Sequence, residues 1–83
     1  MDNFNLSQLS VLIVERHLHL SSMLRGILRE LGVTNVYDAS TPEGGFEEFN
    51  LQGPDVVLVD WSPDFDGIGL LDKIRNDPDS KSP

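Results

Sequence analysis

The apolar residues of the chain follow two spacings, one typical of buried strands and one typical of amphipathic helices. Short apolar runs rich in β-branched residues cover 11–14 and 56–59, and a more mixed run covers 33–39. These runs predict three strands. From His17 to Leu31, apolar residues recur every three or four positions, which predicts a helix that ends at Gly32.

Two further helices are predicted from their start and stop signals. Ser40-Thr41-Pro42-Glu43 combines a hydroxyl cap, a first-turn proline and an acid near the positive end of the helix dipole. The glycine pair at 44–45 weakens this second helix by roughly 1 kcal/mol per glycine relative to alanine, and Gly53-Pro54 ends it. Asp66 is expected to cap a third helix, from Gly67 to about Asn76.

The order strand, helix, strand, helix, strand, helix predicts an α/β fold with a parallel sheet and right-handed crossovers. Ligands of such sheets bind beyond the carboxyl ends of the strands, where the strand order reverses. Asp60 follows the third predicted strand, and Glu15 and Arg16 follow the first. If these strands are neighbours, the three side chains share one crevice.

Composition and charge narrow the classes of protein to consider. The 83 residues suffice for one small domain or part of one. The net charge is −8, and residues 1–37 contain three acids and three bases, so the excess of acids falls in residues 38–83. This balance argues against nucleic-acid binding. There is no cysteine, no apolar run long enough for a membrane span and no signal-peptide pattern at the start, so a cytoplasmic location is expected.

The acid after the third predicted strand suggests two kinds of chemistry. A carboxylate beside other acids can bind a hard cation through its oxygens, and it can attack a phosphoryl group to form an acyl phosphate. The two roles cooperate, because transfer to Asp60 adds negative charge that a magnesium ion would offset.

The chain resembles the receiver domain of bacterial two-component response regulators, a flavodoxin-like family that includes chemotaxis regulators. The resemblance covers residues 10–83 and leaves 1–9 as an N-terminal extension. It implies three strands in the order 2-1-3 with helices on both faces, and only the N-terminal portion of a receiver, with strand four onward absent. The segments that carry it are VLIVER, LRELGV, NVYDAS, PDVVLVDW and DGIGLLDKIRNDP.

The resemblance also implies roles for individual residues. Asp60 would accept a phosphoryl group from a histidine kinase or phosphotransfer protein. Glu15, Asp60 and the backbone carbonyl of Ser62 would hold Mg²⁺. Arg16 stands where the family usually has a second acid that touches the metal, and a guanidinium cannot bind a cation. Two alternatives stay open for Arg16: a salt bridge with Asp60 that takes the place of the metal, or a side chain turned to solvent.

Three functional hypotheses follow. The first is a phosphorylated signalling receiver, and the second is a phosphorylation-independent pseudo-receiver or protein-interaction module, favoured by Arg16. The third is an aspartate-nucleophile phosphohydrolase, which is disfavoured because such enzymes usually have a second acid where Ser62 stands. We therefore expect a signalling domain and not an enzyme.

Other features have simpler interpretations. A third strand at the sheet edge would present unpaired amides and favour self-association. His17 and His19 suggest a metal site, but they are interpreted as ordinary surface or half-buried histidines, because a two-residue spacing does not place both on one helix face. Asp64 and Asp66 are interpreted as a turn acid and a helix cap, and Trp61 as partly packed beside the site.

Overall fold

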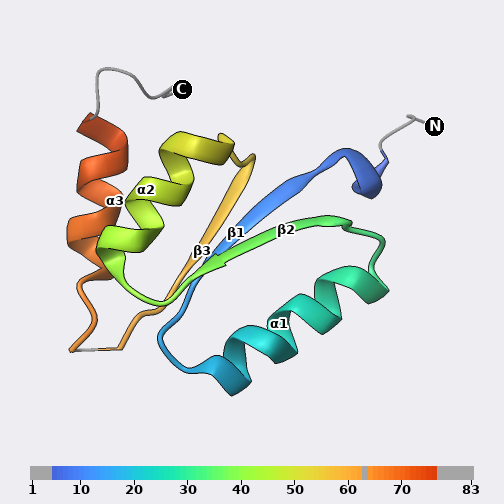
Figure 1. Ribbon diagram of the computed structural model, residues 1–83, viewed down its shortest axis with the longest axis horizontal. Helices are drawn as coiled ribbons and strands as arrows, with labels where there is room; N and C mark the ends of the chain where they lie inside the picture. Colours follow the sequence, from blue (N-terminus) through green and yellow to red (C-terminus); the bar gives the residue numbers. More distant parts are fainter. Residues whose placement is uncertain (1–4, 63, 77–83) are drawn as a thin grey trace.

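The computed structural model describes residues 5–62 and 64–76, and in it three parallel strands form one sheet with helices on both faces (Figure 1). The predicted end of the domain, residues 77–83, lies outside the described residues. The elements in chain order are the 3-10 helix η1 (Leu6–Gln8), β1 (Ser10–Val14), α1 (Leu18–Glu30), β2 (Asn35–Ala39), α2 (Pro42–Gln52), β3 (Val56–Val59) and α3 (Gly67–Asn76).

The strand order is β2-β1-β3, as the resemblance implied. In the register of the central strand, Val11 pairs with Val36 on one side and Val56 on the other, and Val14 pairs with Ala39 and Val59. The first and third strands are therefore neighbours, and their carboxyl ends lie together.

Strand β1 separates two apolar cores. Val11 and Ile13 face α1, whose Leu24 and Leu28 pack against them. Leu12 and Val14 face the opposite side, which α2 and α3 cover (Figure 1). The four residues of β1 from 11 to 14 are at most 1% exposed, because each is covered by sheet neighbours and by a helix.

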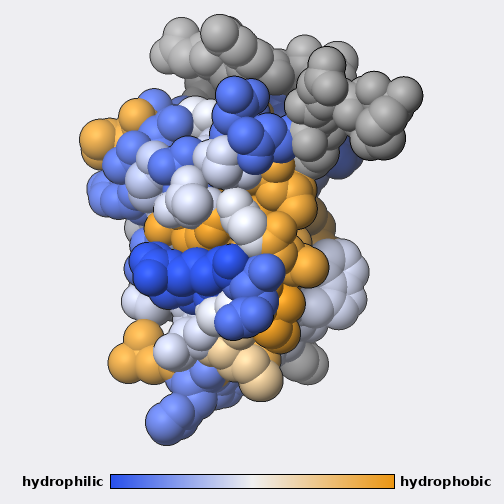
Figure 2. Space-filling model, turned by 90° about the vertical axis from the view of Figure 1, so that its right-hand side faces the viewer, coloured by the Kyte–Doolittle hydropathy of each residue, from blue (hydrophilic) through white to orange (hydrophobic). Residues whose placement is uncertain are grey.

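Helix α1 has a wider apolar face than the sheet covers. Beside Leu24 and Leu28, a second row of apolar side chains is between 39% and 59% exposed. The amphipathic pattern predicted the helix correctly, but it gave no measure of how much of the apolar face would be buried. Apolar residues reach the surface among hydrophilic ones in the view of Figure 2 as well. The exposed row consists of Leu20, Met23, Ile27 and Leu31.

Two predicted boundaries shift for identifiable reasons. His17 has an extended backbone and is the N-cap of α1, so the helix begins at Leu18. Val33 was predicted in the second strand, but its N–H donates to the carbonyl of Leu28 at 2.9 Å. The backbone of Val33 therefore closes α1, although its side chain is buried in the core. The strand itself begins at Asn35.

The glycine pair of α2 has a packing role. The Thr41 hydroxyl accepts a hydrogen bond from the N–H of Gly44 at 2.9 Å, which confirms the predicted cap. A Cβ at Gly45 would lie 2.9 Å from both γ-carbons of Val14 and 3.2 Å from a δ-carbon of Leu70. Gly45 thus lets α2 approach both β1 and α3 closely.

Within the described residues, no helix is long and apolar enough to cross a membrane.

Candidate functional site

The carboxyl ends of β1 and β3 bring the carboxylates of Glu15 and Asp60 close together, as the sequence predicted. The N–H of Glu15 donates to Ala39 at 3.0 Å, and the N–H of Asp60 donates to Val14 at 2.8 Å, so each acid continues the hydrogen bonding of the sheet by one residue. Both acids are buried, with 5% of Glu15 and 8% of Asp60 exposed. Buried carboxylates are costly unless they are bonded or neutralised, which makes their partners informative.

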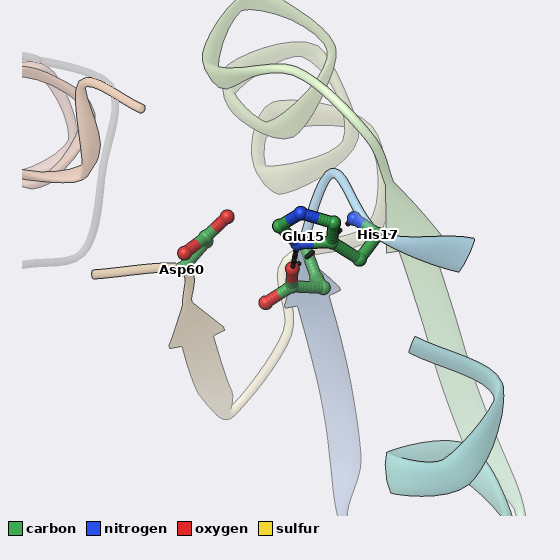
Figure 3. A group of neighbouring side chains, drawn as sticks. All are labelled: Glu15, His17 and Asp60. Atoms are coloured by element: carbon green, nitrogen blue, oxygen red, sulfur yellow. Dashed lines mark hydrogen bonds and ion pairs between the residues drawn. The ribbon is translucent and has the colours of Figure 1, made fainter. Parts of the chain in front are cut away.

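One oxygen of Asp60 is satisfied and the other is not. Oδ1 accepts hydrogen bonds from the hydroxyl of Ser62 at 2.6 Å and from its N–H at 2.8 Å. These bonds, the hydroxyl first, lower the pKa of Asp60, because they stabilise the charged form. Oδ2 is buried and has no hydrogen-bond partner among the described residues. Figure 3 shows the carboxylate at the end of β3, on the side of Glu15 and His17.

His17 belongs to this group, which the sequence analysis missed. Its Nδ1 lies 2.8 Å from Oε2 of Glu15, and its N–H donates to the same oxygen at 3.1 Å. The residue spacing had favoured an ordinary surface or half-buried position for His17 on the helix. As the extended N-cap it precedes the first turn, and its ring turns back toward the strand end (Figure 3). Its position at the start of the predicted helix, two residues after Glu15, was the one signal in the sequence.

Arg16 does not form the salt bridge with Asp60, one of the two alternatives for this residue. Nη1 of Arg16 lies 2.5 Å from Oδ2 of Asp64, an exposed acid of the β3–α3 loop. This hydrogen bond lowers the pKa of Asp64. The exposed partner requires no burial of the guanidinium, whereas Asp60 is buried and already bonded to Ser62. Arg16 therefore ties the loop after β1 to the loop after β3 and leaves Oδ2 of Asp60 unpaired.

The loop from β3 to α3 holds the remaining candidates. The carbonyl of Ser62 accepts the N–H of Phe65 at 3.1 Å, so it already serves a turn; its proposed contact with a metal stays a prediction. Asp66 accepts the N–H of Gly69 at 3.0 Å and caps α3, as expected. Trp61 is 72% exposed, so the expectation that it packs beside the site is wrong.

The donor set fits a divalent cation. Glu15, His17 and Asp60 each offer one ligand atom, and these three atoms lie within 4.8 Å of one another. The unpaired Oδ2 of Asp60 supplies a buried negative atom that a cation would satisfy. Two carboxylates suit Mg²⁺, which prefers oxygen ligands. Position 16 is an arginine and offers no third carboxylate, and the third ligand atom of the group is a ring nitrogen of His17. The site can thus combine a buried, ionised carboxylate with a bound cation.

Comparison with known proteins supports the resemblance to response-regulator receivers. The chain is similar to a protein from Rhizobium etli described as a probable chemotaxis protein CheY, with 31% identity over 75 residues. The aligned region covers 89% of this chain and 58% of that protein, so the chain spans little more than half the length of its relative. No family model matches the chain, and no solved structure matches it.

Proposed function

Since this chain is a relative of the response-regulator receivers in sequence and in fold, we propose that it is a receiver module that accepts a phosphoryl group on Asp60 from a histidine kinase or phosphotransfer protein. The observation that carries the proposal is the Asp60 carboxylate itself. It is buried at the carboxyl end of β3 beside Glu15, with one oxygen held by Ser62 and the other unpaired.

The geometry suits a nucleophile. The lowered pKa of Asp60 keeps its carboxylate ionised at neutral pH. The Ser62 hydrogen bonds orient the group through Oδ1, which leaves Oδ2 to attack phosphorus. The P–N bond of the donor phosphohistidine breaks as the O–P bond forms, and the released imidazole takes a proton from water. A divalent cation at Glu15 and Asp60 would offset the negative charge that the transfer adds.

The test uses a small phosphodonor, acetyl phosphate, with Mg²⁺, and follows the intact mass of the protein. Wild type is expected to gain one phosphoryl group, and Asp60→Asn none. Asp64→Asn is the matched control, because it neutralises the neighbouring acid of the same loop and should still be modified. Absence of modification in wild type, or modification of Asp60→Asn, would refute the assignment. Continuous release of phosphate beyond one equivalent would instead favour the phosphohydrolase hypothesis.

A second candidate function is a phosphorylation-independent interaction module. Strand β3 pairs only with β1 among the described residues, and Val56 at its start is 37% exposed. An open strand edge is a template for pairing with another chain. We propose self-association through this edge, tested by sedimentation velocity over a range of protein concentrations. A dimer or larger species that Asp60→Asn retains would support the module, and a monomer at every concentration would contradict it.

A further inference from the structure

We propose that Glu15, His17 and Asp60 form a binding site for a divalent transition-metal ion, and that this site binds Zn²⁺ or Co²⁺ in preference to Mg²⁺. This metal site coincides with the receiver site of the proposed function and rests on it for its location, but metal binding requires no phosphoryl transfer. It differs from a site made of oxygen ligands alone because a histidine nitrogen takes part.

The site is partly organised before any ion arrives. The three ligand atoms lie within 4.8 Å of one another, so short side-chain rotations bring them to one ion. Asp60 is more than nine-tenths buried, and its Oδ2 has no partner within the part of the chain that the structure describes. Figure 3 shows the three side chains meeting between the ends of β1 and β3. An unpaired buried carboxylate oxygen is costly, and a cation would remove that cost.

The position of His17 makes its ring available as a ligand. The side chain is 56% exposed, so an ion can reach the ring from solvent. Nδ1 already lies 2.8 Å from Oε2 of Glu15, so a metal between these two atoms would replace their hydrogen bond. Arg16, the nearest fixed positive charge in sequence, bonds to Asp64. The guanidinium therefore does not pair with Oδ2 of Asp60 and does not take the place of a metal there.

The donor types decide between metals. Imidazole nitrogen is a good ligand for zinc, cobalt, nickel and copper. Mg²⁺ instead requires oxygen ligands in octahedral geometry and keeps several of its waters. A site with two carboxylates and one imidazole should therefore bind a transition metal more tightly than Mg²⁺. Glu15 would still orient His17 when the ion is bound, since its Oε2 also accepts the backbone N–H of His17.

The experiment measures the binding of Zn²⁺ alone and of Mg²⁺ alone by calorimetry in wild type, His17→Gln and His19→Gln. His19 is the matched control, because it is an exposed histidine two residues away. Wild type should bind one Zn²⁺ per chain at least about tenfold more tightly than Mg²⁺. His17→Gln should weaken Zn²⁺ binding at least about tenfold and leave Mg²⁺ binding unchanged, and His19→Gln should change neither. Circular dichroism checks that each variant is folded.

The visible absorption of bound Co²⁺ provides a second readout, because its bands should shift when the nitrogen ligand is removed in His17→Gln. Equal Zn²⁺ affinity in wild type and His17→Gln, or a loss in His19→Gln instead, would overturn the inference. The two proposals can fail separately. Phosphorylation of Asp60 with no dependence of Zn²⁺ binding on His17 refutes the metal preference alone. Zn²⁺ binding that depends on His17, in a protein that is never phosphorylated, refutes the receiver function alone.

Discussion

Replacement of Gly45 by alanine tests how closely α2 packs on the sheet. The added Cβ would meet both γ-carbons of Val14 at 2.9 Å, and a δ-carbon of Leu70 at 3.2 Å. Val14 is 0% exposed and β-branched, so it has little freedom to move aside. Overpacking of this kind costs about 1–3 kcal/mol. Alanine also gains roughly 1 kcal/mol in helix propensity, so the free energy of unfolding should fall by about 0–2 kcal/mol.

Gly26→Ala isolates the propensity term. Gly26 lies in α1, and a Cβ there would meet no atom within 4 Å. This variant should therefore be stabilised by roughly 1 kcal/mol. The difference between the two variants, about 1–3 kcal/mol, then measures the cost of the contact with Val14 and Leu70.

Urea denaturation of wild type and both variants gives the two changes in the free energy of unfolding. The comparison requires that the dependence of this free energy on urea concentration has the same slope in all three proteins. If Gly45→Ala stabilises the protein as much as Gly26→Ala does, α2 does not pack against β1 as described, and the packing argument is refuted.

Four further predictions concern the loop from β3 to α3. Ser62→Ala should raise the pKa of Asp60 toward its usual value of 3.8, followed by carboxyl ¹³C NMR, because the hydroxyl is the main cause of its lowering. Arg16→Gln should raise the pKa of Asp64 more than that of Asp60 in the same titration. The pKa values of Asp60 and Asp64 in the folded protein lie below 3.8. The stabilisation from these two acids is therefore complete above pH 3.8 and is lost as the pH falls through the folded pKa values. Acid unfolding of wild type and Asp64→Asn should show this loss. Asp66→Ala should cost about 1 kcal/mol in urea denaturation, through loss of the α3 cap.

The sequence predicted best where local chemistry decides the structure. Strand β3 and helix α3 have the predicted bounds, because an apolar run between Pro54 and Asp60 and a cap at Asp66 define them without help from distant residues. The meeting of Glu15 and Asp60 followed from the topology of parallel sheets.

The errors arose where distant geometry decides. The partner of Arg16 depends on the path of a loop that carries both Asp60 and Asp64, and the residue types do not distinguish these two acids. The orientation of His17 depends on whether it precedes or begins α1, a difference of one residue that no pattern resolves. The spacing of the apolar residues in α1 likewise does not show how many of them the sheet covers.

Gly67, the first residue of α3, lies in close contact with the backbone of Asp60. A Cβ at this position would lie 2.7 Å from the carbonyl oxygen of Asp60 and 2.7 Å from a γ-carbon of Val59. The start of α3 therefore rests on the main chain of the site with only a hydrogen atom between them. A side chain at position 67 would require the start of α3 to move away from the end of β3. A library randomised at codon 67 and selected for folded protein should therefore return glycine alone. Because of this close contact, a shift of the Asp60 backbone toward α3 requires α3 to move as well. The position of α3 is thus coupled to the backbone of Asp60.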